Sequence, residues 1–303
     1  MAAWLLQRAR DAVASLPDQR REELALVLRL RPGESDDWDH ISRWLTIAFH
    51  DDEAGQPVVS QFRGYDRLEE FDWQGYRAKY GDIQRLDRIL EAEGDTTNRY
   101  RLSKQADVLM LFYLLSAEEL AQLFTLMGYD FHPDLIPRTI AYYLGRTSHG
   151  STLSRVVHSR VLARSDRAAS WDFFVEALES DIADIQGGTT SEGIHLGAMS
   201  GTIDLVERGW TGLHVRDDVL HLDPLLPREL RCLQLSIRYR HVWGLGIKVT
   251  ADRLTVTMPQ FDGAPIRVGV GDRVVDLQPG TSTDFALPGP TPGESGSATS
   301  VSR

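Results

Sequence analysis

Apolar residues along the first two thirds of the chain recur every three or four positions, which is the spacing of an amphipathic helix. The pattern predicts helices over residues 1–16, 36–48, 83–94, 108–115, 117–127, 151–163, 166–185 and 193–208. Pro17, Gly94 and Gly128 mark three helix ends, because proline blocks a helix and glycine adopts the left-handed cap. Many helices with little sheet between them indicate a helical bundle or toroid.

Two of these segments carry further predictions. Ser116 and Glu119 have the spacing of a capping box at the start of the helix over 117–127. The segment 108–115 is almost entirely apolar, so we expect its helix to be buried on most sides. The aromatic-rich stretch 55–81 follows neither the helical period nor the alternation of a strand, and it is expected to be irregular.

After Pro224 the apolar period changes to two, which predicts strands near 233–239, 247–250, 254–258, 266–270 and 275–277. Asp252-Arg253 and Gly271-Asp272 lie at the expected hairpin turns. We therefore expect a small antiparallel sheet or sandwich with one solvated face. The predicted fold is mainly α, with a helical portion over 1–215, a β module over 216–286 and a disordered tail over 287–303.

The 303 residues carry a net charge of −11, which argues against binding to a nucleic-acid backbone or an anionic membrane surface. The single cysteine, Cys232, excludes an internal disulfide and a multi-cysteine metal site. A lone cysteine is usually a small buried hydrophobe, and we expect that here rather than a nucleophile. No secretory signal or membrane-spanning stretch is visible, so a cytoplasmic location is expected.

Two polar stretches precede predicted helices. Lys104 and Gln105 offer donors and an acceptor of the kind that hold sugar hydroxyls, although on this segment alone a plain helix cap with solvated charges is the commoner explanation. His149, Ser151 and Thr152 follow Arg146 at the next helix start, where free N–H groups and the helix dipole favour an anion. The alternative for this second stretch is an ordinary Ser/Thr cap.

A glycine-rich loop over 186–193 leads into a third helix and brings Glu192 and His195 three positions apart. Its glycines permit close backbone approach to a ligand, but it lacks the lysine of a P-loop and a preceding strand. A metal site from His149, Glu192 and His195 is conceivable, yet these residues have no tight ligand spacing, so no metal is expected.

Together these stretches resemble the C-terminal half of glycoside hydrolase family 65, which includes maltose, trehalose and kojibiose phosphorylases and some hydrolases. The resemblance rests on RYRLSKQADVLMLFYLL, RTSHGSTLSRVVHS and DIQGGTTSEGIHLGAMSGT, with GYDRLEEFDW, GDIQRLDRILEAEG and LHLDPLLPRELRCLQLSIRYR in the same order. It runs from Met1 to about Phe285. It implies the later helices of an (α/α)6 toroid followed by a C-terminal β module. The helix that begins uncapped at Met1 fits a truncated form of such a protein.

The resemblance implies inversion at the anomeric carbon of an α-linked glucose disaccharide such as trehalose, maltose or kojibiose. The family's general acid, a glutamate, is expected upstream of Met1, which leaves Glu192 as the possible base in this chain. Lys104 and Gln105 would hold the glucosyl unit. The residues matching the family's phosphate pocket are His149, Ser151, Thr152 and His195. No cofactor is implied, and inorganic phosphate is the possible co-substrate.

Gly150 stands where phosphorylases often carry an aspartate and some hydrolases a glutamate, which weakens a hydrolase interpretation and leaves room for an anion. Three functions stay open: a phosphorylase, a hydrolase that uses water, and an inactive half that completes a toroid with another chain. A separate N-terminal half or a homo-oligomer would be the partner.

Overall fold

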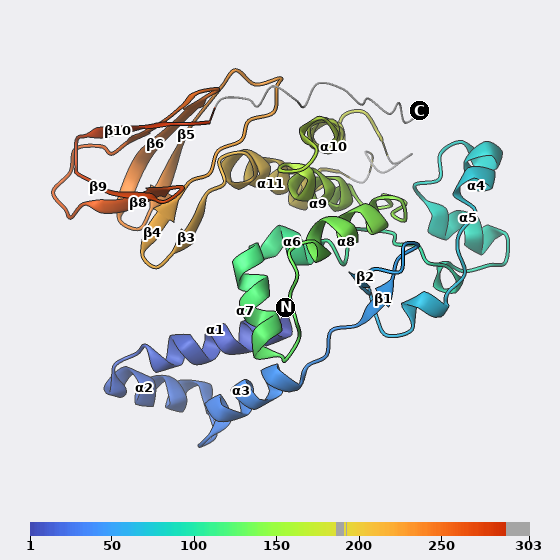
Figure 1. The fold of residues 1–303 in the computed structure, drawn as a ribbon, viewed down its shortest axis with the longest axis horizontal. Helices are drawn as coiled ribbons and strands as arrows, with labels where there is room; N and C mark the ends of the chain where they lie inside the picture. The colour runs from blue at the N-terminus through green and yellow to red at the C-terminus, as the bar shows by residue number, and fades with distance from the viewer. Residues whose placement is uncertain (186–190, 192, 289–303) are drawn as a thin grey trace. The chain divides into compact units, whose positions relative to one another are not determined.

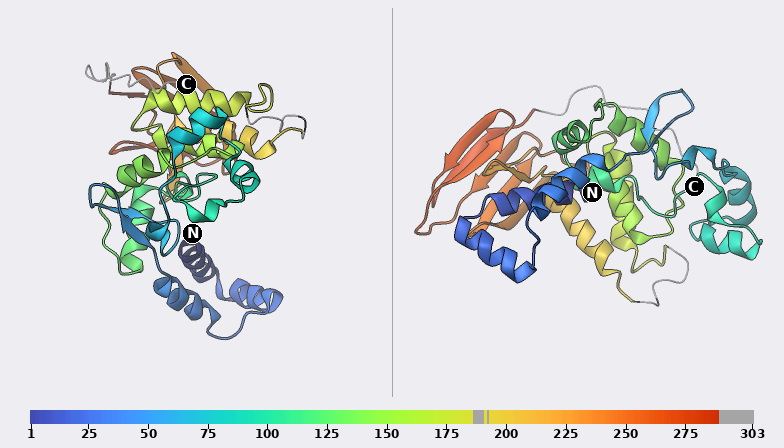
Figure 2. Two further views of the ribbon diagram at one scale, coloured as in Figure 1. Left: turned by 90° about the vertical axis from the view of Figure 1, so that its right-hand side faces the viewer. Right: turned by 90° about the horizontal axis from the view of Figure 1, so that it is seen from below.

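The computed structural model describes residues 1–185, 191 and 193–288. The chain divides into two compact units, the first over Met1–Val161 and the second from Leu162 onward, and each is described by itself. Figures 1 and 2 show the ribbon from three sides. Most of the predicted tail, residues 289–303, lies outside the described residues.

The first unit is mainly helical, as the apolar period predicts. Its helices are α1 (Ala2–Ala14), α2 (Asp18–Leu28), α3 (Glu34–Trp44), α4 (Trp73–Tyr80), α5 (Leu86–Ala92), α6 (Met110–Leu114), α7 (Ala117–Leu126), α8 (Leu135–Leu144) and α9 (Thr152–Leu162). A short hairpin pairs β1 (Phe49–Asp51) with β2 (Pro57–Val59), and two 3₁₀ turns, η1 (Tyr65–Arg67) and η2 (Thr97–Arg99), follow. The capping box of Ser116 and Glu119 is confirmed.

Several elements differ from the prediction. The segment 108–115 forms only the short helix α6, whose last residue, Leu114, is exposed. The prediction that this helix is buried on most sides is therefore wrong. The pattern missed α2, whose apolar residues are consecutive instead of periodic. It also missed α8, where Pro137 lies in the first turn and breaks the expected signal, although proline is tolerated there. The stretch taken as irregular contains β2, η1 and α4.

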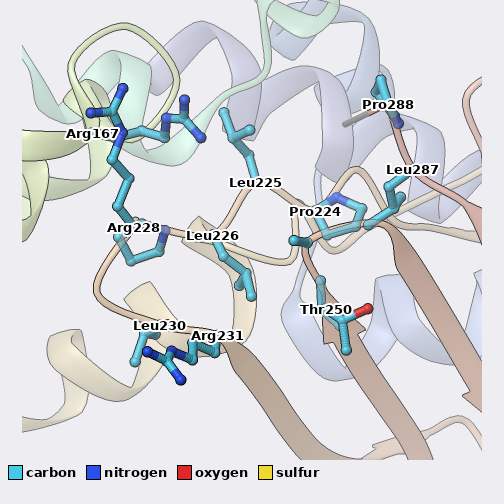
Figure 3. A pocket seen from close by; sticks show the side chains of 13 residues that line it. Arg167, Pro224, Leu225, Leu226, Arg228, Leu230, Arg231, Thr250, Leu287 and Pro288 are labelled. Atoms are coloured by element: carbon cyan, nitrogen blue, oxygen red, sulfur yellow. The ribbon is translucent and has the colours of Figure 1, made fainter. Parts of the chain in front are cut away.

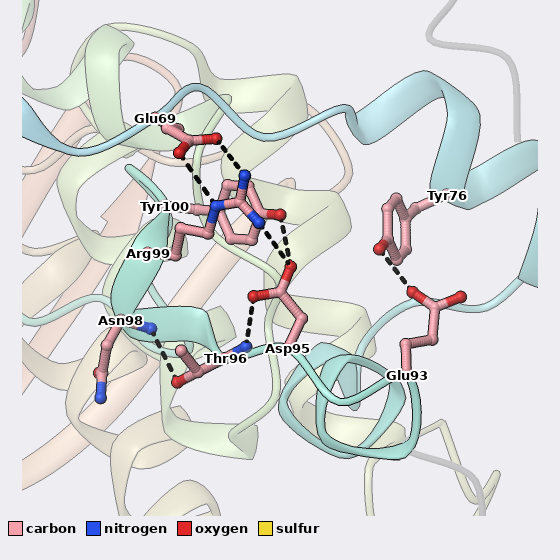
Figure 4. A network of polar contacts seen from close by, with 8 residues as sticks. All are labelled: Glu69, Tyr76, Glu93, Asp95, Thr96, Asn98, Arg99 and Tyr100. Atoms are coloured by element: carbon pink, nitrogen blue, oxygen red, sulfur yellow. Dashed lines mark hydrogen bonds and ion pairs between the residues drawn. The ribbon is translucent and has the colours of Figure 1, made fainter.

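A hydrophobic cluster joins the segments that lead to Lys104. Its buried members are Phe71, Ile83, Leu86, Leu90 and Leu102. Tyr76 and Tyr100 pack against this cluster and belong to a polar network (Figure 4), in which Arg99 pairs with Glu69 at 2.9 Å and Tyr100 donates to Asp95 at 2.6 Å. In the same network Tyr76 donates to Glu93 at 2.6 Å. A hydrogen bond from Lys79, with others from tyrosines, lowers the pKa of Glu93 to about 2.

Over its described residues, the second unit combines two α-helices with two four-stranded sheets. The helices are α10 (Arg167–Glu179) and α11 (Leu196–Asp204), which continues as the π-helical turn η4 (Leu205–Gly209). The strands are β3 (His214–Arg216), β4 (Val219–His221), β5 (Cys232–Tyr239), β6 (Val242–Thr250), β7 (Arg253–Thr257), β8 (Ile266–Val270), β9 (Arg273–Leu277) and β10 (Ser282–Ala286). The sheet orders are β10-β7-β6-β5 and β3-β4-β8-β9.

The two sheets form a sandwich (Figures 1 and 2), because residues from both belong to one buried core. Leu245, Ile247 and Leu254 from one sheet pack with Leu220 and Val268 from the other, and all five are fully buried. The prediction of a mainly helical chain with a C-terminal β module is confirmed. Two details are corrected: β4 pairs with β8 in parallel, and the strands begin before Pro224.

The prediction for Cys232 is also wrong. The residue is a free thiol and is exposed, instead of being a buried hydrophobe. The physical reason is its place as the first residue of β5, an edge strand in which every second residue from Cys232 onward is exposed to solvent.

Candidate functional site

The structure brings two of the predicted polar stretches together in the first unit. Ser103 N–H donates to the carbonyl of Arg146 at 2.7 Å, and Ser148 N–H donates back to the carbonyl of Ser103 at 2.9 Å. Gly150 N–H then donates to the carbonyl of Lys104 at 2.9 Å. These three bonds lay the chain around Lys104 against the chain that leads into α9.

Ion pairs hold one stretch in place, and a backbone hydrogen bond holds the other. The Arg146 guanidinium pairs with Glu70 at 3.0 Å and with Glu53, and it lies 3.9 Å above the centre of the Tyr142 ring. On the other stretch, Arg101 N–H donates to the carbonyl of Glu69 at 2.7 Å. The backbone that carries the candidate residues is therefore fixed on both sides.

Lys104 and Gln105 are both exposed, and each meets a carboxylate. Lys104 Nζ pairs with Asp87 of α5 at 2.9 Å, and Gln105 Nε2 donates to Asp107 at 3.0 Å. Burial is the largest single effect on Asp87 and would raise its pKa, but the hydrogen bond from Lys104 and the charges of Lys104 and Arg85 together outweigh burial, so the pKa is lowered. Asp87 fixes the ammonium of Lys104, a role that the sequence pattern did not indicate.

His149 lies at the turn into α9 with a left-handed backbone, at φ of 55°. Its Nδ1 is 3.0 Å from the hydroxyl of Ser154, and its ring packs edge-on against His158 at 4.6 Å. Burial, followed by the charges of His158 and Arg155, holds the pKa of His149 well below its usual value. The imidazole is therefore neutral and engaged with α9, and its contact with phosphate stays a prediction.

Ser151 and Thr152 lie at the start of α9. Thr152 is buried, whereas Ser151 is partly exposed and accepts a hydrogen bond from Ser154 N–H at 3.1 Å through its carbonyl. The neighbouring Gly150 is tightly packed. A Cβ added there would be 2.8 Å from the carbonyl oxygen of Gln84 and 3.0 Å from Cγ of Lys104.

His195 belongs to the second unit, where it precedes α11. Asp181 contacts it twice, since its Oδ2 accepts from His195 N–H at 2.9 Å and its Oδ1 lies 2.5 Å from Nδ1. The hydrogen bond from His195 lowers the pKa of Asp181, so this carboxylate is ionised and orients the imidazole. The sequence analysis missed Asp181, because its spacing of 14 residues from His195 follows no local pattern.

The predicted base and the predicted absence of a metal site can be compared with the structure only in part. Glu192, the possible base, lies outside the described residues, as does most of the glycine-rich loop. Within the described part of the chain, no group of three or more His, Cys, Asp or Glu side chains could hold a metal ion. Over the same residues, no helix is long and apolar enough to span a membrane.

Comparison with known proteins extends this picture. The family model described as the glycosyl hydrolase family 65 central catalytic domain matches residues 1–204. The model of the family's C-terminal domain matches residues 213–277.

Individual relatives agree with the family models. An uncharacterized glycosyl hydrolase of Mycobacterium tuberculosis is 49% identical over 92% of this chain and 21% of that protein. Trehalose 6-phosphate phosphorylase of Lactococcus lactis is 35% identical over 78% of this chain and 30% of its own length. The structure of a putative kojibiose phosphorylase from human microbiome shares the fold, with a TM-score of 0.67 at 20% identity over 91% of this chain and 35% of that chain.

This chain thus spans about a fifth to a third of the length of these relatives. Both family models match in the expected order, and they cover the helical portion and the β module in turn. The chain belongs to glycosyl hydrolase family 65.

Proposed function

We propose that this chain carries the glucosyl- and phosphate-binding part of an inverting phosphorylase that acts on an α-linked glucose disaccharide such as trehalose, maltose or kojibiose. Its helices, over 1–215, would form part of an (α/α)6 toroid, with the β module over 216–286. Relatives named as phosphorylases of trehalose 6-phosphate, kojibiose and trehalose support the substrate class.

The observation that carries the proposal is the pairing of the Ser103–Lys104 segment with the Ser148–Gly150 segment. It places a lysine and an amide beside a run of hydroxyls at a helix start. Lys104 and Gln105 would hold the hydroxyls of the glucosyl unit. Ser151 and Thr152 would donate to a phosphate oxygen, which the positive end of the α9 dipole favours.

We propose that His195 in the second unit also contacts phosphate, with Asp181 as its positioning residue. With Nδ1–H donating to the carboxylate, Nε2 is the ring atom left to contact an anion, and it can donate to that anion only when both ring nitrogens carry a proton. Asp181 would act through His195 by accepting from Nδ1 and holding one ring orientation.

In this mechanism a carboxylic acid protonates the leaving oxygen, while phosphate attacks the anomeric carbon from the opposite face. The general acid would come from residues upstream of Met1. A hydrolase would need a carboxylate to activate water, and position 150 carries a glycine. The absence of a side chain there supports phosphate as the nucleophile.

Binding to the 303-residue chain tests the proposal directly. We expect inorganic phosphate, titrated by calorimetry, to bind more weakly to Ser151→Ala by about tenfold, since one charge-assisted hydrogen bond is lost. Lys104→Ala should weaken glucose binding and spare phosphate. Lys79→Ala is the matched control, because this exposed lysine also pairs with a carboxylate but lies on α4. Equal effects of Lys104→Ala and Lys79→Ala would contradict the assignment.

Turnover separates the remaining functions. The chain alone should not cleave α-glucose disaccharides, because proton donation is worth about 10²–10⁴-fold in rate. In a longer form that contains the acid, we expect glucose 1-phosphate as product. Ser151→Ala with His195→Ala should then sharply raise the phosphate concentration required. Equal rates without phosphate, together with a large loss in Glu192→Gln, would identify a hydrolase instead.

A further inference from the structure

A cavity lies in the C-terminal unit, apart from the residues discussed so far. Its volume is about 420 Å³, within the range of small-molecule pockets. Its walls come from the start of α10, the loop 224–231, the β6–β7 turn and the chain after β10. Figure 3 shows Arg167, Arg228 and Arg231 on one side and Leu287 and Pro288 on the other.

The charge of this pocket is opposite to that of the chain. Of the described residues that line it, three are arginines and none is acidic, whereas the whole chain has a net charge of −11. Arg167 and Arg228 also interact with other groups of the protein. A guanidinium has five N–H donors, so an arginine that is already engaged can still donate to a ligand.

The rest of the lining is apolar. Leu225, Leu226 and Leu230 come from the loop, and Val249 and Leu287 come from the sheet side. Such walls suit a hydrocarbon or aromatic body and offer few partners for the many hydroxyls of a sugar. A ligand for this pocket therefore needs both an apolar body and a negative group.

The walls are also held in place. Leu225 N–H donates to the carbonyl of Trp210 at 2.8 Å, and Arg164 pairs with Asp223 at 3.1 Å just before the loop. On the opposite wall, Leu287 N–H donates to the carbonyl of Asp252 at 2.9 Å. The pocket is thus formed by backbone that is hydrogen-bonded in the protein itself, as in preformed ligand sites.

We propose that this pocket binds a small amphiphilic anion, a carboxylate or phosphate monoester on an apolar body, with its charge on the arginines and its body on the leucines. The site is independent of the disaccharide and phosphate chemistry proposed above.

Calorimetry with four probes tests the proposal on the 303-residue chain. We expect 4-phenylbutyrate and 4-phenylbutyl phosphate to bind at least about tenfold more tightly than 4-phenylbutanol, which has the same body without charge. The stronger of the two anions identifies the head group. Inorganic phosphate should not compete, since it lacks the apolar body. Equal affinity for the alcohol and the anions would overturn the proposal.

Variants locate the binding. Arg231→Ala should weaken both anions about tenfold and leave the alcohol unchanged, whereas Arg267→Ala, an exposed arginine on β8 outside the pocket, should change nothing. Ala251→Trp, at the exposed turn, should fill the cavity and abolish binding of all three organic probes. Ser151→Ala should have no effect, which separates this site from the proposed phosphate site. Equal losses in Arg231→Ala and Arg267→Ala, or full binding in Ala251→Trp, would refute the assignment.

Discussion

Gly150 is the position where a single methyl group should reveal how tightly the candidate site is packed. In Gly150→Ala the new Cβ would lie 2.8 Å from the carbonyl oxygen of Gln84 and 3.0 Å from Cγ of Lys104. Ordinary van der Waals contact between such atoms needs about 3.5–4.0 Å. The Lys104 side chain can move, but the Gln84 carbonyl is backbone and must shift by several tenths of an ångström.

The shift has a calculable cost. Overpacking by one methyl group in a well-packed region destabilises a protein by typically about 1–3 kcal/mol. The Gln84 side chain accepts a hydrogen bond from Arg155 at 2.8 Å, so the backbone at Gln84 is not free to yield without loss. We therefore expect Gly150→Ala to lower the free energy of unfolding by about 2 kcal/mol.

Gly145→Ala is the matched control, five positions earlier in the same connection. Gly145 has φ of −76°, and nothing lies within 4 Å of an added Cβ. Alanine should be neutral there or stabilise by about 0.4–1 kcal/mol, because it restricts the unfolded chain. Urea denaturation followed by tryptophan fluorescence measures both variants at constant slope. Equal stability of the two variants would refute the packing argument.

Two further predictions concern the first unit. Burial lowers the pKa of His158 to about 4. Between about pH 6.5 and pH 4, the imidazole of His158 is therefore protonated in the unfolded chain but not in the folded chain. The free energy of unfolding should fall by about 3 kcal/mol as the pH drops through this window. NMR titration of the imidazole checks this, and a midpoint near pH 6.5 would contradict it. Leu26 and Trp44 are 80% and 75% exposed, so the chain should self-associate. The double variant Leu26→Gln with Trp44→Gln should reduce this association in analytical ultracentrifugation. A wild-type chain that stays monomeric at high concentration would contradict the prediction.

Strong periodicity and explicit caps explain which elements the sequence predicts. The helix α7 has both an apolar period and a capping box, and its boundaries agree closely with the prediction. Strand β6 alternates buried and exposed positions over part of its length, as the period of two requires. The failures occur where the local pattern misleads. The helix α2 has a continuous apolar run, and α6 is shortened although its immediate neighbours Leu109 and Leu115 are apolar.

The candidate site shows a different limit. Local sequence identifies Lys104 and the hydroxyl run after Gly150 as separate polar stretches, but the bonds between them join residues far apart in the chain. No spacing rule predicts that Asp87 pairs with Lys104 or that Asp181 pairs with His195. These carboxylates are recognised only when the fold brings their oxygens within hydrogen-bond distance.

Gly150 matters to the proposal in two connected ways. In the sequence, the glycine leaves position 150 without a carboxylate, which favours phosphate over an activated water as the nucleophile. In the structure it is also the residue whose lack of a side chain lets Lys104 and the Gln84 carbonyl approach. Any side chain at this position would meet Cγ of Lys104, the side chain that we propose binds glucose and that Asp87 holds at 2.9 Å. The glycine at position 150 and the place of Lys104 are therefore parts of one packing arrangement, so a side chain added at position 150 should also disturb the proposed sugar contact.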